Sequence, residues 1–327
     1  MLTKKDDISD TSVKSGRVNI LHVINSLQIG GSEKYLVNLA NAINKNKFNC
    51  FVAYGGSSHL LNDLNLDIKA IKISQKPLSF TLASSSHIFR FMEIYRNYGI
   101  DIVHVHLFDS GLLASIAAKL VNIPIVHQIA GSIETQTIKQ KIISKIPIVR
   151  RLIYELSNIY TTCAYYSVQE LINKWHIPES KIRLIHHGIN IERFNPRVKD
   201  LRDEFNIDIE TPVLGFVGRL HPEKGIPDML RIFREVRKLV YSKLLIVGDG
   251  EYRAKYEQLA VELGISGDVI FTGFRNDIPE VMKTFDVYFQ TTRAPLLGTA
   301  VLEAMAVGKP IITLARNEEE KRMAMET

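Results

Sequence analysis

Residues 215–236 read GFVGRLHPEKGIPDMLRIFREV, and residues 22–43 read HVINSLQIGGSEKYLVNLANAI. Each stretch begins as an apolar run, continues through a turn that contains glycine, and ends with apolar residues at helical spacing. This order of strand, turn and amphipathic helix is typical of the βα units of an α/β domain. Because it occurs twice and far apart in the chain, it predicts two domains of similar fold rather than a short repeat.

The rest of the chain continues the alternation of strands and helices. It predicts mainly parallel sheets covered by helices. We expect a helix from Ile226 to Tyr241 and interpret Ser167 with Glu170 as a capping box that opens another. The predicted strands lie in residues 17–25, 48–56, 68–73, 101–108, 123–131, 181–190, 212–218, 243–250, 268–274, 286–292 and 309–313.

Length and composition favour two domains. The chain has 327 residues, 46% of them apolar, and single cores rarely grow beyond about 250–300 residues. A polar, charged segment over residues 190–212 separates the two sets of strands. We therefore expect a disordered segment at residues 1–16, one Rossmann-like domain at 17–195 and a second at 196–327.

Several functional classes are disfavoured by the sequence. No long apolar window predicts a membrane span, the polar start lacks the apolar core of a signal peptide, and two cysteines are too few for a disulfide framework. We therefore expect a cytoplasmic protein with no nucleic-acid partner. Neither a complete G-x-G-x-x-G nor a Walker motif is present, which argues against dehydrogenases and P-loop enzymes. No D-x-D pair ends an apolar strand, so we expect no metal and no cofactor.

Arg219 and Lys224 lie in the turn GRLHPEKG, directly after the apolar run PVLGFV. A guanidinium can bind two phosphate oxygens, and an ammonium adds a second charge. Such a pair can stabilise a diphosphate leaving group without a metal ion. The alternative is an ordinary solvated turn.

Four segments of the second half, VGRLHPEKGIPDML, LLIVGDGEYR, DVIFTGFRNDIPEVMKTFDVYF and VLEAMAVGKPII, occur in the order and spacing that resemble family 4 retaining glycosyltransferases. GGSEKYLVNLA, DIVHVH and HHGINIERFNP look like the matching segments of the first half. The resemblance covers residues 17 to 313. It implies the two-lobed GT-B fold, with a nucleotide-sugar bound in the cleft between the lobes.

The resemblance also implies roles for single residues. Arg219 and Lys224 bind the donor diphosphate, and Glu303, early in a helix that starts near Gly298, binds the ribose hydroxyls. In the first lobe, Gly30 and Gly31 let the backbone approach the donor. The catalytic candidate His127, after the IPIV strand, lies beside the transferred sugar.

The chain departs from the family pattern at two places. Pro295 stands where the family has a glutamate that contacts the donor sugar, and only Gly298 of that loop is retained. The chain also ends 24 residues after Glu303, where the family continues, so the second lobe is expected to be truncated. These departures leave open an alternative: a catalytically impaired remnant that binds a nucleotide-sugar or a partner protein.

Two further features have alternative interpretations. His104 and His106 alternate on a predicted strand and therefore point to one face; we interpret them as structural or sheet-end residues. Residues 137–160 combine basic and apolar side chains. They are read as a helical pair that covers the sheet, or alternatively, over residues 138–152, as a surface for anionic lipid.

The function expected from the sequence is transfer of a sugar from a nucleotide-sugar to a glycan or lipid-linked acceptor. Retention of configuration and a role in cell-surface polysaccharide synthesis follow from the resemblance, and metal independence follows from the missing D-x-D pair. The protein is expected in the cytoplasm, or peripherally on the cytoplasmic face of the membrane. The first 195 residues are the basic part, with 22 Lys and Arg against 14 Asp and Glu.

Overall fold

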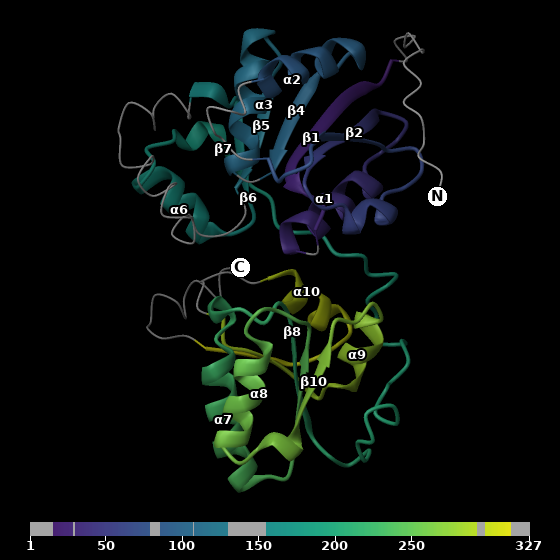
Figure 1. The fold of residues 1–327 in the computed structure, drawn as a ribbon, viewed down its shortest axis with the longest axis vertical. Coiled ribbons are helices and arrows are strands. Elements are labelled where there is room, and N and C mark those ends of the chain that lie inside the picture. The colour runs from purple at the N-terminus through teal and green to yellow at the C-terminus, as the bar shows by residue number, and fades with distance from the viewer. Residues whose placement is uncertain are drawn as a thin grey trace. The chain divides into compact units, whose positions relative to one another are not determined.

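A computed structural model describes residues 16–28, 30–78, 86–106, 108–129, 155–292 and 298–314. The chain folds as two units, one with residues 1–163 and 167–185, the other with residues 164–166 and 186–327. Each unit is a parallel sheet flanked by helices (Figure 1). The predicted boundary, near residue 195, lies within the second unit.

The first unit has a seven-stranded sheet in the order β3-β2-β1-β4-β5-β6-β7. Its strands are β1 (Val18–Ser26), β2 (Phe48–Gly55), β3 (Lys69–Ser74), β4 (Ile102–His106), β5 (Ile125–Ile129), β6 (Ile159–Thr162) and β7 (Ile182–Leu184). Its described helices are α1 (Gly31–Ala42), α2 (Ser86–Asn97), α3 (Phe108–Leu120) and α6 (Tyr165–Asn173), with 3-10 turns η1 (His59–Asp63) and η4 (Glu179–Lys181).

The second unit has a five-stranded sheet in the order β10-β9-β8-β11-β12. Its strands are β8 (Val213–Val217), β9 (Lys243–Val247), β10 (Val269–Gly273), β11 (Val287–Gln290) and β12 (Ile311–Thr313). Its described helices are α7 (Ile226–Leu239), α8 (Arg253–Glu262), α9 (Ile278–Thr284) and α10 (Thr299–Ala306), with η5 (Pro222–Lys224) and η6 (Ser266–Asp268).

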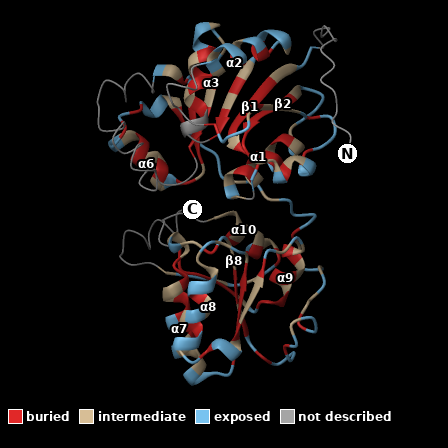
Figure 2. Ribbon diagram, in the orientation of Figure 1, coloured by how far each residue is buried: buried red, intermediate tan, exposed pale blue. Residues whose placement is uncertain are grey.

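Alternate residues of β1 pack on opposite faces of its sheet. Leu21 and Val23 join a buried cluster with α2 and α3, whereas Ile24 joins a cluster with α1 and β2. Both faces of the sheet are therefore covered, as parallel sheets require. Figure 2 shows the result in both units: buried residues follow the strands, and exposed residues follow the outer sides of the helices.

The fold class predicted from the sequence is confirmed, with differences in detail. Strand β6 was missed, because its first residues were included in the helical interpretation of 137–160. The capping box at Ser167 is wrong: α6 already begins at Tyr165, and the Ser167 side chain is buried within the helix. The helix predicted from Ile226 ends at Leu239 instead of Tyr241. The lipid-binding candidate, residues 138–152, lies outside the described residues.

The segment between the two sheets is packed rather than loose. Phe194 and Ile207 are buried in the core of the second unit. Arg202, also buried, donates to the carbonyls of Asp208, Ile209 and Thr211 and forms an ion pair with Asp286 at 2.8 Å. This segment is therefore part of the fold of the second unit.

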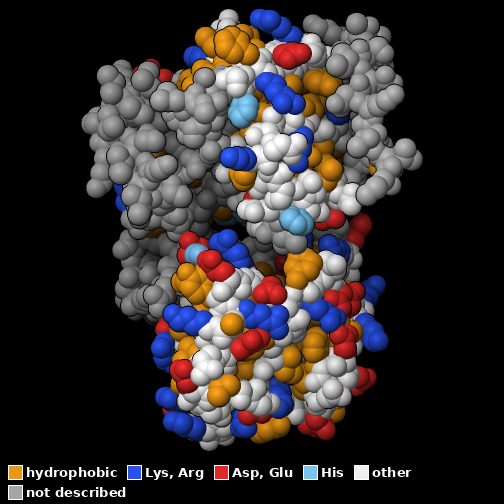
Figure 3. Space-filling view, in the orientation of Figure 1, with side chains coloured by type: hydrophobic (Ala, Val, Ile, Leu, Met, Phe, Trp, Pro, Cys, Tyr) orange, Lys and Arg blue, Asp and Glu red, His pale blue; other side chains and the backbone are white. Residues whose placement is uncertain are grey.

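The surface of the second unit mixes charges of both signs (Figure 3). Arg234 and Lys238 of α7 pair with Glu235, and Arg253 of α8 pairs with Glu257. Such exposed pairs contribute little to stability, on the order of 0–1 kcal/mol each. Within the described part of the chain, no helix combines the length and the apolar character needed to cross a bilayer.

Candidate functional site

The turn Gly218–Gly225 connects β8 to α7 at the carboxyl end of a central strand. β8 lies between β9 and β11, where the strand order reverses, and ligands of open α/β sheets bind at such positions. The Gly218 amide donates to the Val247 carbonyl, and the Leu220 amide donates to that of Asp249. The turn is thus fixed to the neighbouring strand end by backbone hydrogen bonds.

Gly225 closes this turn in a conformation that favours glycine. Its φ is 68°, in the left-handed region, and a Cβ atom there would collide with the carbonyl oxygen of Thr291. The buried Thr291 hydroxyl donates to the carbonyls of Lys224 and Gly225, at 3.1 and 3.0 Å. Thr291, which the sequence analysis did not single out, therefore fixes the backbone that carries Lys224.

The two cations of the turn differ in exposure. The Arg219 side chain is 62% exposed, and its Nη2 lies 3.8 Å from the Glu223 carboxylate. Lys224 is half-buried, with no carboxylate within ion-pair distance among the residues that the structure describes. Burial lowers the pKa of the Lys224 ammonium; Glu223 raises this pKa and Arg219 lowers it. A partly desolvated ammonium beside a second cation is suited to an anionic ligand.

Glu223 is the residue that sequence reasoning missed in this turn. Its carboxylate lies 3.8 Å from Arg219 and 3.5 Å from His221 Nδ1. It therefore neutralises part of the charge that a phosphate would meet. The spacing of Arg219 and Glu223, four residues apart, could have indicated the contact.

Glu303 lies in the second turn of α10, because the helix begins at Thr299 and has no acidic residue in its first turn. The helix start expected near Gly298 is confirmed, and Glu303 lies just beyond the first turn. The Glu303 side chain is partly exposed. Burial is the main cause that raises the pKa of the Tyr288 hydroxyl, and the charge of Glu303 raises this pKa further. Gly298 caps the helix in an extended conformation. Pro295 lies outside the described residues.

Gly30 and Gly31 mark the start of α1 in the first unit. A Cβ atom at Gly30 would contact the carboxylate of Glu33, a buried residue in the first helical turn, so the missing side chain makes room for Glu33. A Cβ atom at Gly31 would meet no atom within 4 Å. Their role in approaching a donor stays a prediction.

His127 lies inside β5, within the predicted strand 123–131, because the strand continues past the residues IPIV. Its side chain is buried, stacks on Tyr160 at 5.7 Å between ring centroids, and has Nδ1 3.5 Å from the Ser157 hydroxyl. It is in register with Val105 on β4 and lies close to Gly111 of α3. These contacts place it within the sheet packing; its proposed role beside the sugar stays a prediction.

Two family models match the chain. The model described as Glycosyltransferase Family 4 matches residues 29–193, and the model described as Glycosyl transferases group 1 matches residues 198–322. The chain belongs to these glycosyltransferases. The turn Gly218–Gly225, which we call the cationic turn because it carries Arg219 and Lys224, lies within the second match.

Similar proteins include glycosyltransferases that act on different acceptors. The UDP-Gal:alpha-D-GlcNAc-diphosphoundecaprenol alpha-1,3-galactosyltransferase of Escherichia coli is 28% identical over 65% of this chain and 57% of its own length. The alpha-monoglucosyldiacylglycerol synthase of Streptococcus pneumoniae is 26% identical over 68% of this chain and 53% of its own. The matches thus span a little over half the length of these two relatives.

Solved structures share the fold at low identity. The Anabaena protein HepE in complex with UDP and glucose has a TM-score of 0.74 at 20% identity, and covers 91% of this chain and 80% of its own. WaaG, a glycosyltransferase involved in lipopolysaccharide biosynthesis, has a TM-score of 0.70 at 16% identity, with 94% and 84% covered. The glycosyltransferase therefore has the fold of GT-B enzymes.

Proposed function

We propose that this glycosyltransferase transfers a sugar from a nucleotide-sugar donor to a glycan or lipid-linked acceptor, with retention of anomeric configuration and without a metal ion. The observation that carries the proposal is the turn after β8, which presents Arg219 and the half-buried Lys224 at the carboxyl end of a central strand. The acceptors and donors named for the relatives support the substrate class.

In the proposed reaction, the two cations bind the donor diphosphate and stabilise the charge that develops as the sugar leaves. The exposed Arg219 side chain meets a phosphate at the surface, whereas the Lys224 backbone is held by the Thr291 hydroxyl. In this proposal Glu303 binds the ribose hydroxyls. Gly298 is the residue that this chain shares with the loop that contacts the donor sugar in the family.

The test is a panel of nucleotide-sugars, with detection of the released nucleoside diphosphate. Addition of a chelator tests metal independence, and the coupling constant of the product anomeric proton in NMR tests retention. Release of nucleoside diphosphate that needs a divalent cation, or a product of inverted configuration, would contradict the corresponding part of the proposal.

A second candidate is a chain that binds the donor with little or no transfer. The observation that favours it is Pro295, which has no amide hydrogen and no side-chain acceptor where the family has a glutamate. Nucleoside-diphosphate binding without turnover, with turnover gained in Pro295→Glu, supports this candidate. Rapid transfer by the wild type excludes it.

Peripheral binding to the cytoplasmic face of a membrane is a further part of the proposal, with a role in cell-surface polysaccharide synthesis. The basic and apolar residues of 138–152 motivate it. Co-sedimentation with liposomes should rise with the fraction of anionic lipid and fall with salt, because salt screens the attraction. Binding that depends on neither variable would contradict it.

A further inference from the structure

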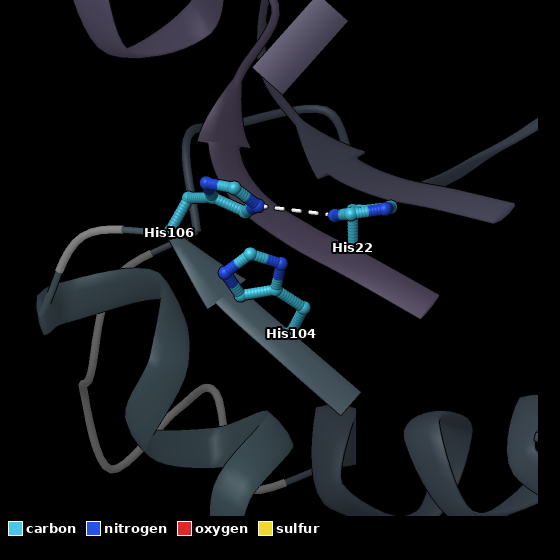
Figure 4. A group of neighbouring side chains, drawn as sticks. All are labelled: His22, His104 and His106. Carbon is cyan, nitrogen blue, oxygen red and sulfur yellow. Dashed lines mark hydrogen bonds between the residues drawn. The ribbon is translucent and has the colours of Figure 1, made fainter. Parts of the chain in front are cut away.

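Three histidines of the first unit face one another across two neighbouring strands. His22 of β1 is in register with His104 of β4, and His106 follows two residues later on the same face (Figure 4). The ring centroids of His104 and His106 are 4.2 Å apart, and those of His22 and His104 are 5.1 Å apart. The shared face predicted for His104 and His106 is confirmed, and β1 adds a third imidazole.

The trio lies where the order of the first sheet reverses. β1 and β4 are adjacent, although β2 and β3 come between them in the chain, and His106 is the last residue of β4. His22 and His106 are almost fully buried, at 1% exposure each. The trio lies on the face of the sheet that α1 covers, since Tyr35 of that helix is the aromatic neighbour of His106.

We propose that His22, His104 and His106 bind one borderline divalent transition-metal ion, with Zn²⁺ as the probe. One nitrogen from each ring lies within 4.8 Å of the other two. Imidazole nitrogen suits Zn²⁺ and its neighbours in the first transition series, whereas Mg²⁺ and Ca²⁺ prefer oxygen ligands.

One of the three nitrogen separations is already close to that of a metal site. His22 Nδ1 and His106 Nε2 are 3.1 Å apart, and two nitrogens bound at about 2.0–2.1 Å to a tetrahedral Zn²⁺ are separated by roughly 3.3 Å. In a protein without metal these two atoms share a hydrogen bond. When an ion binds, this proton moves to the other nitrogen of its own ring, so that both rings stay neutral and turn a lone pair toward the ion. Rotation of the His104 ring, whose nitrogen lies within 4.8 Å of the other two, brings a third nitrogen to the ion.

The surroundings favour coordination. His22 and His106 are almost fully buried and His104 is half-buried, so that little water competes for their nitrogens. The buried His104 Nε2 has no hydrogen-bond partner in the described part of the chain. The second nitrogen of His22, Nε2, lies 3.8 Å from Cys50 Sγ. Such a partner orients a ligating ring, as outer hydrogen bonds do in known sites.

Cys50 itself is not assigned as a ligand. Its Sγ lies beside His22 Nε2, whereas it is Nδ1 of that ring that faces His106 Nε2. The site is therefore composed of imidazoles from two central strands, and a bound ion would join β1 to β4. This inference does not depend on the proposed transfer reaction, because it concerns only residues of the first unit.

The experiment uses the full chain, without a histidine tag and freed of metal by a chelator. Zn²⁺ is added in a calorimetric titration, and Co²⁺ is added in parallel because its visible absorption reports tetrahedral coordination. The variants are His104→Gln and His106→Gln, and the matched control is His59→Gln, an exposed histidine in η1 of the same unit. Circular dichroism checks that each variant is folded.

The proposal expects one Zn²⁺ per chain, affinity lower by roughly tenfold or more in both variants, and unchanged affinity in the control. X-ray absorption of the Zn²⁺-loaded wild type should show imidazole scattering with Zn–N at about 2.0 Å. This measurement needs no variant, so it holds even if the variants do not fold. Absence of saturable Zn²⁺ binding, equal binding by all proteins, or a spectrum without imidazole scattering would overturn the proposal and leave a trio in which His22 and His106 share a hydrogen bond.

Discussion

The two sheets share the same order around their first strand but differ in the chemistry beside it. β3-β2-β1-β4-β5 of the first unit corresponds to β10-β9-β8-β11-β12 of the second. In the second unit, the strand is followed by a turn with an exposed Arg219 and a half-buried Lys224. In the first unit, the adjacent strands carry three histidines, two buried and one half-buried, whose pKa values burial lowers. The two units thus differ in the charge that they carry near their first strand.

The difference follows from burial rather than from residue type alone. A charge must stay near solvent or meet a partner, because burial of an isolated ion is costly. An imidazole can lose its proton and remain buried, and the lowered pKa values of the histidines are the consequence. For this reason we assign an anionic ligand to the cationic turn in the proposed function and propose a cation for the histidine trio.

The largest expected effect tests whether the cationic turn needs its backbone conformation. Gly225→Ala should lower the free energy of unfolding of the second unit by about 3 kcal/mol, because both the left-handed φ and the Thr291 carbonyl oppose a Cβ atom. The matched control is Gly264→Ala, also at positive φ but with no atom within 4 Å of the added Cβ, where about 1 kcal/mol is expected. Chemical denaturation measures both; equal losses would mean that the Thr291 contact has no effect.

The second effect tests the charges of the turn. Arg219→Ala and Lys224→Ala should each weaken binding of a nucleoside diphosphate by about 1.5–3 kcal/mol, the scale of hydrogen bonds to charged groups. Lys238→Ala on α7, where the lysine pairs with Glu235, is the control and should bind normally. If calorimetry finds unchanged affinity in both turn variants, the assignment of this turn to the diphosphate is wrong.

The third effect distinguishes the two cations by pH. Because the pKa of Lys224 is lowered, the ammonium loses its proton at a lower pH than an ordinary lysine does. Diphosphate affinity should therefore fall as the pH is raised toward 10, starting below the ordinary lysine pKa of about 10.4. Lys224→Arg should remove this fall, since a guanidinium keeps its proton throughout that range. The same pH profile in both proteins would show that Lys224 does not titrate at the site.

The smallest effect concerns the counter-charge. Glu223→Gln removes a carboxylate 3.8 Å from Arg219 and 3.5 Å from His221. Affinity for a nucleoside diphosphate should rise by about 0.2–1 kcal/mol, the usual range for exposed ion pairs. Weaker binding in the variant would mean that Glu223 orients Arg219 instead of competing with the ligand.

The sequence predicted most of the fold because the strand signals are local. The run KLLIVGDG, for example, combines β-branched residues with a glycine turn, and its KLLIV part forms β9. Strand β6 was missed because Ile159 and Tyr160 follow a long basic and apolar segment, so that their spacing was read as helical. Ser167 has the spacing of a capping box, but the helix begins two residues earlier and the serine faces the core.

The site was predictable only where it depends on residues close in sequence. Arg219 and Lys224 are five residues apart and could be read as one turn. Thr291 acts on that turn from 66 residues away through its hydroxyl, and His22 meets His106 across 84 residues. Such contacts depend on the strand order, which local patterns do not determine. For the same reason, the orientation of His127 within the sheet was not foreseen.

The packed segment before β8 has a consequence for chimeric enzymes. Exchange of halves between relatives is usually planned at the polar stretch that separates two domains. Here, however, Phe194, Arg202 and Ile207 belong to the core and hydrogen-bond network of the second unit. If the two sequences are joined at Pro212, Arg202 comes from one relative and its ion-pair partner Asp286 from the other. If they are joined near His186, the second unit keeps its own Phe194, Arg202 and Ile207.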